Sequence, residues 1–357
     1  MNRRRVIALL AVVTAAIGIA GSAPAQATLP GHNGRIAFWD FTTGQVYTVA
    51  PNGSGLRQLT NVDAAHVAIR PRWSPGGGRI IFTLVRSNTP DDHARIWSMR
   101  ADGTHAHQLS RDRVGFRDYT GAFTPDGRRI VFARCQPNDG VCAIWEMHAD
   151  GSHMRAITPF RTGRDEAVDF SPSVSARGAI VFTRFFWRGV ASQNWMIPPG
   201  GGQGRPVTPV RLEAGAADWA PSGRAIDFGS NSQRPNSSLY QVGADGTHLR
   251  RLTTTRYPHS DFAPTYSPDG TSIAFISDRR HPDLCCNDLF VANADGTHMR
   301  RIPTGQLHGI LEPAWGPSAG GAAVSLPTRA HTIAEPRRSP IRLPALCRLE
   351  TIPEPYC

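Results

Sequence analysis

Residues 261–277 read DFAPTYSPDGTSIAFIS, and residues 289–303 read LFVANADGTHMRRIP. The first stretch joins two apolar segments through Ser-Pro-Asp-Gly, in which proline already has the φ angle of the second position of a type I turn. The second stretch joins an apolar segment to a short one through Asp-Gly, a strong hairpin signal. Together they predict an antiparallel unit of four strands, which we call A, B, C and D in chain order.

This unit recurs along the chain with a period of ~48 residues. Strand A is expected to end at an aromatic residue followed by a small residue and proline, and strand D to end in Leu/Ile-Thr. The first signature appears as Trp73-Ser74-Pro75, Phe123-Thr124-Pro125, Phe170-Ser171-Pro172, Trp219-Ala220-Pro221 and Tyr266-Ser267-Pro268. A long period, four strands per unit and all-β content predict a β-propeller.

The two ends of the repeat predict how the ring closes. The first unit begins at strand B, with Gly34 to Phe38, and the last consists of strand A alone, at residues 311–317. One missing strand and one orphan strand complete a sixth blade, and this closure removes the last exposed sheet edges. The predicted fold is therefore an all-β, six-bladed propeller of four-stranded antiparallel blades, closed by a blade built from both chain ends.

The repeat resembles the TolB-like family of propeller repeats, most closely from Asp261 to Arg279 and at Asp288-Leu289-Phe290 and Ala294-Asp295-Gly296. The resemblance covers about residues 34–317. The fourth unit departs from the pattern, because both of its turns lack Asp and Gly200-Gly201-Gly202 replaces the second turn. The resemblance implies the fold and says little about function.

The segments outside the repeat predict an exported protein. Three arginines (Arg3 to Arg5), an apolar run from Val6 to Ala20 and Ala25-Gln26-Ala27 have the pattern of a cleaved signal peptide, residues 1–27. Cleavage after Ala25 and twin-arginine export are the open alternatives. The propeller is then expected over residues 28–325, followed by a proline-rich tail at 326–357, in a secreted, periplasmic or cell-envelope protein without a transmembrane segment.

The charge of the chain does not indicate a nucleic-acid partner. The net charge is +11, and loss of the three signal-peptide arginines leaves +8. The arginines lie mostly in turns and form no run interleaved with aromatic residues, so we expect no nucleic acid. The expected partner is an envelope or secreted protein or peptide, and the propeller is expected to be monomeric.

The six cysteines suggest disulfides in an exported chain. Cys135 and Cys142 bracket the B–C loop of the third unit, at facing hairpin positions, and are expected to pair. Cys285 and Cys286 lie in the B–C loop of a later unit, where each is expected to pair with Cys347 or Cys357 of the tail. No cofactor and no metal are expected from these patterns.

Two other patterns are interpreted as structural. His105, His153, His248 and His298 follow four equivalent Asp-Gly turns. Each is therefore expected on the outer rim of a different blade, too far apart for one metal ion. Gly316-Pro317-Ser318-Ala319-Gly320 matches the nucleophile-elbow pattern but falls at a propeller turn, with no acid-and-histidine hydrolase domain after it.

The D–A connections, which precede strand A of each unit, are expected to open onto the central funnel. They contain acids, histidines and a tyrosine where loops converge, so they form the candidate binding site. The candidate residues are Asp118, Tyr119, Asp165, Glu166, His259 and Asp261. Acids gathered at one mouth predict a local negative field, suited to a cationic segment or a divalent ion.

These observations predict a non-enzymatic module at the cell envelope that binds a protein or a peptide. No recognisable catalytic set accompanies the propeller, so no catalytic residue is assigned. Two alternatives stay open: an enzyme working at the funnel, such as a lyase or hydrolase on a glycan or peptide, and a structural surface protein anchored by its tail.

Overall fold

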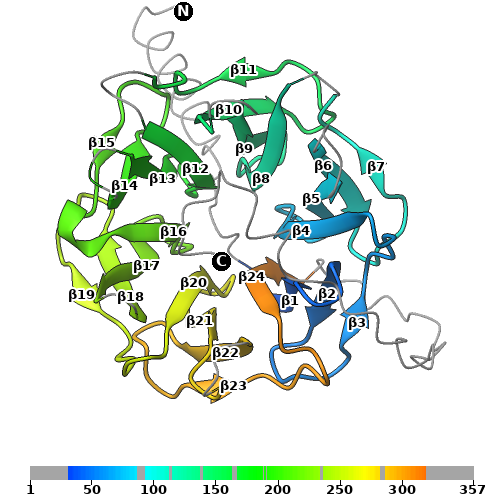
Figure 1. The fold of residues 1–357 in the computed structure, drawn as a ribbon, viewed down its shortest axis with the longest axis vertical. Coiled ribbons are helices and arrows are strands. Elements are labelled where there is room, and N and C mark those ends of the chain that lie inside the picture. The colour runs from blue at the N-terminus through cyan, green and yellow to red at the C-terminus, as the bar shows by residue number, and fades with distance from the viewer. Residues whose placement is uncertain are drawn as a thin grey trace, which may run out of the picture.

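The computed structural model describes residues 31–86, 93–111, 115–136, 140–162, 167–187, 189, 191–233, 236–281 and 286–318. Within these residues the strands form six four-stranded antiparallel sheets arranged as blades around one axis (Figure 1). This confirms the predicted propeller. The signal peptide and the tail, with Cys285, Cys347 and Cys357, lie outside the described residues.

The blades are numbered from the chain start, and each is given from its inner to its outer strand. Blade 1 has β24 (Ile310–Pro317), β1 (Asn33–Asp40), β2 (Gln45–Val49) and β3 (Arg57–Gln58). Blade 2 has β4 (His66–Trp73), β5 (Arg79–Arg86), β6 (His93–Arg100) and β7 (His107–Gln108). Blade 3 has β8 (Arg117–Phe123), β9 (Arg129–Cys135), β10 (Cys142–His148) and β11 (Arg155–Ala156).

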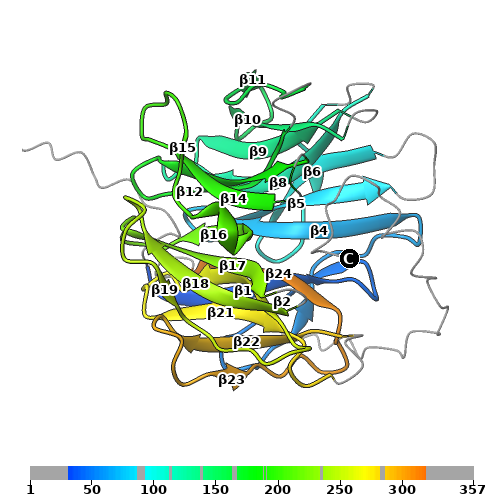
Figure 2. The ribbon, with the colours of Figure 1, turned by 60° about the vertical axis from the view of Figure 1, so that its left-hand side comes forward.

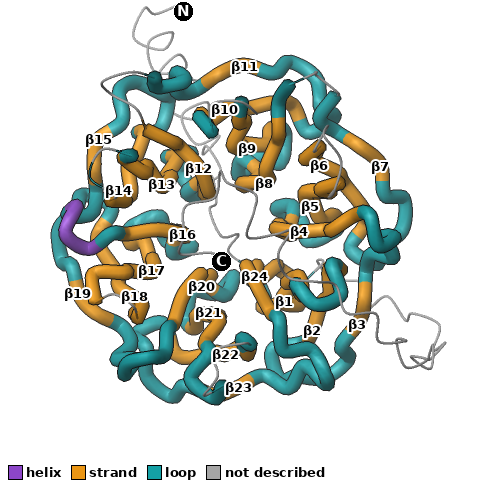
Figure 3. Tube along the Cα trace, viewed as in Figure 1, coloured by secondary structure: helices purple, strands orange, loops and turns teal. Residues whose placement is uncertain are grey.

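The second half of the ring repeats this order. Blade 4 has β12 (Ala167–Val174), β13 (Ile180–Phe186), β14 (Ala191–Ile197) and β15 (Arg205–Pro206). Blade 5 has β16 (Ala214–Trp219), β17 (Ala225–Gln233), β18 (Asn236–Gly243) and β19 (Arg250–Arg251). Blade 6 has β20 (Asp261–Tyr266), β21 (Ser272–Ser277), β22 (Asp288–Asn293) and β23 (Arg300–Arg301). The 3-10 turn η2 (Val210–Leu212) lies at the edge of the ring between β15 and β16 (Figure 3).

Closure of the ring occurs in blade 1, as the repeat predicts. β24 pairs antiparallel with β1, for example Ala314 with Ala37 and Ile310 with Asp40. The turned view of Figure 2 shows β24 beside β1, although the two strands lie at opposite ends of the repeat.

A search of the described residues finds no helix with the length and hydropathy of a membrane span.

The sequence analysis assigns one of the five aromatic-small-proline signatures to the wrong place in its strand. Phe170-Ser171-Pro172 does not end strand A of blade 4, because β12 continues to Val174 and the turn follows at Ser175. Ser171 and Pro172 instead sit at a β-bulge inside the strand, between Phe170 and Ser173. The error arises because proline is tolerated at a bulge as well as at a turn.

The blade cores are apolar on both faces. The second strands are almost completely buried, with Ile36, Ile80, Ile130 and Ile273 showing no exposed surface. Stacking each sheet between two others buries both faces, which explains the continuous apolar runs of these strands.

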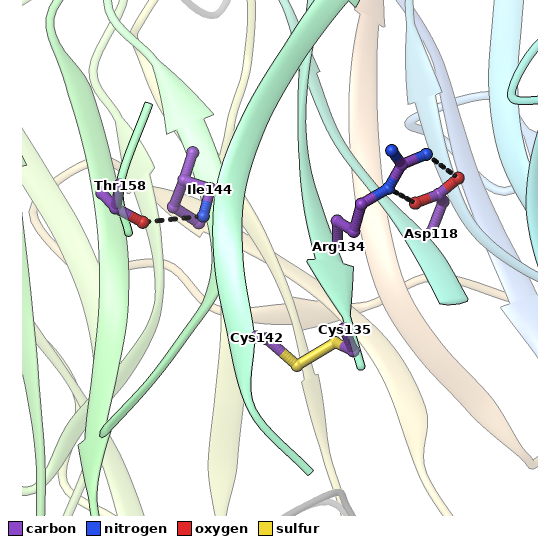
Figure 4. The surroundings of a disulfide bond; sticks show 6 residues. All are labelled: Asp118, Arg134, Cys135, Cys142, Ile144 and Thr158. Atoms are coloured by element: carbon purple, nitrogen blue, oxygen red, sulfur yellow. Dashed lines mark hydrogen bonds and ion pairs between the residues drawn. A yellow bond between two sulfur atoms is a disulfide. The ribbon is translucent and has the colours of Figure 1, made fainter. Parts of the chain in front are cut away.

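The Leu/Ile-Thr signature has a structural role at the outer strand. After the two-residue ladder of strand D ends, a hydroxyl oxygen accepts the next backbone N–H of strand C. Thr158 Oγ1 accepts from Ile144 N at 2.9 Å (Figure 4). Ser110 and Thr253 accept the equivalent hydrogen bond in blades 2 and 5. The signature therefore pairs backbone groups that the short strand leaves open.

Candidate functional site

The inner strand of each blade carries a β-bulge, and the bulges repeat around the axis. In five blades the residue at the bulge has a positive φ, between 47° and 55°. These residues are Arg70, Ser171, Ala216, Ala263 and Glu312. Non-glycine residues with positive φ are uncommon, so their recurrence at the same position of five blades shows that the bulge is part of the repeat. Bulges re-aim the side chains that follow them.

The side chains two positions beyond the bulges surround a cavity in the central channel. This cavity has a volume of about 100 Å³ and is lined by residues of all six inner strands. Its charged lining residues are Arg72, Asp218 and Glu312. Sequence reasoning missed Arg72 and Asp218. The available signal was a proline at the bulge of four inner strands, one residue before the channel-facing position: Pro71, Pro172, Pro264 and Pro313.

Asp218 is held by neighbouring blades on both sides. Its Oδ1 accepts from Ser173 Oγ of blade 4 at 2.8 Å, and its Oδ2 accepts from Thr265 Oγ1 of blade 6 at 3.0 Å. Burial nevertheless raises the pKa of the Asp218 carboxyl, and burial lowers the pKa of the Arg72 guanidinium in the same channel. The cavity is therefore a polar, desolvated place of mixed charge.

A second network joins blades 1, 2 and 3 beside the channel. Arg70 Nε lies 3.0 Å from Glu312 Oε1, and Trp39 Nε1 donates to Glu312 Oε2 at 2.9 Å. The Arg70 guanidinium lies 5.3 Å from the ring centre of Tyr119, a cation–π contact. Tyr119, a candidate site residue, is thus buried at 8% exposure and in contact with a cation.

The structure places Asp118 and Asp261 in buried ion pairs. Arg134 of β9 donates to both oxygens of Asp118 at 2.7 and 2.9 Å (Figure 4), and Arg279 donates to Asp261 at 2.6 Å. The same arrangement joins Asp169 to Arg184 in blade 4 at 2.6 Å. These arginines cancel the negative field that the acids alone would produce.

An aromatic ring of strand C completes each of these pairs. The arginine of the pair stacks on Trp145, Trp195 or Phe290, with distances to the ring centres of 4.9, 4.2 and 5.3 Å. The buried charge is therefore neutralised on one side and covered by a ring on the other, which makes Asp118 and Asp261 parts of the blade scaffold.

The other candidate residues lie elsewhere. His259 is half-buried, with Nδ1 3.6 Å from Asp278 Oδ1. Asp165 and Glu166 lie outside the described residues. The expected disulfide between Cys135 and Cys142 is present (Figure 4).

The four rim histidines are turn residues, as expected. His105, His153, His248 and His298 are exposed and have φ between 53° and 56°. The equivalent position in blade 1 is Gly55, with φ 61°. Histidine tolerates the left-handed conformation better than most residues, which accounts for its use in this turn.

Two exposed apolar side chains mark the D–A connections. Among the described residues, Val210 is 51% exposed and Tyr257 is 70% exposed, and they are the large apolar residues that the fold leaves uncovered. They lie on the connections that lead into blades 5 and 6, next to the exposed Arg211 and Arg256. The sequence analysis did not single out these two residues. The available signal was that each is an apolar residue outside the strand pattern of the repeat.

The comparisons with known proteins match this architecture. No protein-family model matches the chain, and no curated protein matches it in sequence. TolB from Acinetobacter baumannii superposes with a TM-score of 0.62 at 18% identity, over 81% of this chain and 68% of that one. The chain is similar to TolB in fold.

Other solved propellers are similar to the same degree. A second structure, putative TolB from Agrobacterium tumefaciens, has a TM-score of 0.55 at 16% identity, over 76% of this chain and 88% of that one. The tricorn protease has a TM-score of 0.58 at 16% identity, over 80% of this chain and 27% of that one. At these identities the TolB likeness establishes the propeller and leaves the activity to the site.

Proposed function

We propose that the protein is a non-enzymatic, extracytoplasmic binding module that engages a protein or peptide of the cell envelope through its D–A face. This face comprises the D–A connections and B–C loops at one end of the ring. The observation that carries the proposal is the exposure of Val210 and Tyr257 on adjacent D–A connections. Exposed apolar side chains within a polar rim are typical of protein-binding surfaces.

The neighbours of these residues indicate the chemistry of the partner. Arg211 follows Val210 and Arg256 precedes Tyr257, and tyrosine and arginine are among the side chains enriched at interface hot spots. Because the buried acids of this face are neutralised by arginine, the favoured partner carries an apolar residue with acidic groups. This differs from the cationic segment that the acids alone predict.

The channel supports a large partner over a small ligand. Its cavity of about 100 Å³ is well below the ~300–1,000 Å³ of pockets that enclose small molecules. The tip of a side chain or a chain end fits such a space, while the rest of a partner lies on the rigid face around it.

Cross-linking in intact envelopes tests the proposal. A photo-reactive residue at position 257 is expected to capture a defined partner, and the double variant Val210→Ser with Arg256→Glu is expected to abolish that capture without lowering Tm. Asp165→Arg with Glu166→Arg tests the acidic part of the sequence-based site in the same assay. A partner with acidic groups predicts that this variant keeps capture, and loss of capture would favour the cationic segment that the acids alone predict.

The matched control lies on the opposite face. A photo-reactive residue at position 153, or the double variant His153→Asn with His248→Asn, changes exposed C–D turns and keeps a side chain that tolerates their φ. Capture from position 153 together with failure at position 257 would show that the C–D face, with its arginine-rich rim, is the binding surface.

A further inference from the structure

Two histidines and an aspartate meet where blade 6 joins the strand that closes the ring. His281 follows β21 in the B–C loop, Asp288 is the first residue of β22, and His308 lies on the connection from β23 to β24. His281 Nε2 lies 3.3 Å from Asp288 Oδ2, and His308 Nδ1 lies 3.8 Å from Asp288 Oδ1. One potential ligand atom from each residue lies within 4.8 Å of the others.

One side-chain atom of each residue in this cluster is buried without a hydrogen bond. The Asp288 side chain is 2% exposed, yet its Oδ1 makes no hydrogen bond with any described residue, and neither do His281 Nε2 and His308 Nδ1. Native proteins pair nearly all buried polar atoms, so unpaired atoms that face one another indicate a ligand between them. Arg301 Nε is 3.0 Å from Asp288 Oδ1, but this contact also lacks hydrogen-bond geometry.

The backbone holds the three residues in place. Asn287 N donates to His308 O at 2.5 Å, and Asn287 and Gly309 form a parallel bridge between the two loops. Gly309 N in turn donates to the buried Asp40 Oδ2 of blade 1 at 2.9 Å. His281 N donates to Asp278 O at 2.7 Å. Backbone hydrogen bonds therefore fix the positions of His281, Asp288 and His308, which do not depend on side-chain contacts alone.

We propose that His281, Asp288 and His308 bind a zinc-like divalent transition-metal ion. In a tetrahedral site with bonds of about 2.0–2.1 Å, neighbouring ligand atoms lie about 3.3 Å apart, close to the shortest separation in the cluster. Two imidazole nitrogens and one carboxylate oxygen form a donor set that suits Zn²⁺ and leave a fourth position for water.

Arg301 is the competing cation. Its side chain is 27% exposed, so it can move into solvent when the ion binds Asp288. In the absence of metal it partly compensates the buried carboxylate. Arg301 therefore weakens metal binding, and its removal is expected to strengthen it.

The position of the cluster gives the ion a role in closure. His281 and Asp288 belong to blade 6, whereas His308 leads into β24, which completes blade 1. A bound ion would tie the last full blade to the closing strand and stabilise the ring against opening.

The test is a titration of the exported, oxidised full-length protein after treatment with a chelator. Calorimetry with ZnCl₂ is expected to show one tight site, and Co²⁺ to give the strong visible absorption of four-coordinate cobalt. His281→Gln and His308→Gln, each in a partly exposed residue, are expected to weaken this site at least ~100-fold. Arg301→Gln is expected to tighten it. Zinc is expected to raise the Tm of the wild type and of Arg301→Gln, but not that of His281→Gln or His308→Gln.

The control is a second histidine pair within the described residues. His148 and His153 stack at 4.3 Å on the C–D face and form an accessible surface site. His153→Gln is expected to leave the tight site unchanged. The proposal is overturned if the wild type binds no zinc, or if His153→Gln removes the tight site while His281→Gln and His308→Gln keep it.

Discussion

Asp227 of β17 is a buried carboxyl next to another carboxyl, Asp218 of β16, its cross-strand partner. Its Oδ1 accepts from Tyr266 Oη at 2.6 Å and from Gln241 Nε2 at 3.0 Å, while its Oδ2 has no hydrogen bond within the part of the chain that the structure describes. Burial raises the pKa of Asp227 to about 7, with a smaller contribution from the charge of Asp218 and an opposing one from Arg250. The folded state therefore holds a proton that the unfolded chain releases near pH 4.

Asp227 makes the folding stability fall as pH rises. A folded pKa above the unfolded value contributes stability that is fully present below about pH 4 and is lost as pH rises through about 7. Asp227→Asn keeps the acceptor for Tyr266 and Gln241 but cannot ionise. We expect the variant to be more stable than the wild type at pH 8 by roughly 1–4 kcal/mol, with the difference shrinking at pH 5.

Urea unfolding of both proteins at pH 5 and pH 8 measures this effect. Asp218 titrates in both proteins, so only the difference between them reports on Asp227. Parallel pH dependences would contradict the raised pKa.

At the scale of elements, the C–D turn of one blade locks against strand D of the blade before it. A Cβ at Gly151 of blade 3 would lie 2.1 Å from the Leu109 carbonyl oxygen of blade 2, and Gly296 of blade 6 meets Leu252 in the same way. Gly103 of blade 2 would meet the Leu59 oxygen at 2.5 Å. The Asp-Gly of the turn thus serves the contact between blades as well as the hairpin.

Gly151→Ala is expected to destabilise the protein through this contact. The φ of +85° costs an alanine about 1 kcal/mol, and the clash with a backbone oxygen adds about 1–3 kcal/mol because the preceding blade must move. The matched control is Gly201→Ala, whose φ is +94° with no atom within 4 Å of the new Cβ. In thermal unfolding, the Tm is expected to be highest for the wild type, lower for Gly201→Ala and lowest for Gly151→Ala. An equal loss of Tm in the two variants would contradict a stabilising contact between the turn and the preceding blade.

At the scale of the molecule, stability depends on a strand supplied by the far end of the repeat. β24 pairs with β1, and its Trp315 Nε1 donates to Gly34 O at 3.3 Å. Trp73 of blade 2 donates to Ala314 O at 3.1 Å, so β24 also contacts the next blade. Trp315 N donates to Thr265 Oγ1 of blade 6 at 3.5 Å, so the closing strand joins blades 6, 1 and 2.

Deletion of residues 311–357 is expected to open the ring. The loss of β24 exposes the edge of β1 and the apolar inner face of blade 1, so the chain is expected to unfold at clearly lower denaturant or to aggregate. Deletion of residues 326–357 alone leaves β24 intact and is the control. Denaturant midpoints read by tryptophan fluorescence compare the three chains, and equal midpoints for the two deletions would refute closure by both ends.

The sequence by itself determined the propeller, its closure, the Cys135–Cys142 pair and the turn role of the rim histidines. These features depend on local turn chemistry and on a period, and both are written in consecutive residues. The misreading of Phe170-Ser171-Pro172 marks the limit of such reasoning, because Pro172 is compatible with a turn and with a bulge, and only the pairing of β12 with β13 distinguishes them.

Only the tertiary structure decided which side chains act together. The bulges bring Arg72 and Asp218 into one channel. Strand pairing places arginines against Asp118 and Asp261, so these carboxylates, which the sequence analysis expected at the mouth of the funnel, are neutralised. His281 and His308 meet because two loops bridge at Asn287 and Gly309. Such juxtapositions depend on register and on contacts between residues far apart in the chain, and a register shift of one residue moves a side chain to the other face of its strand.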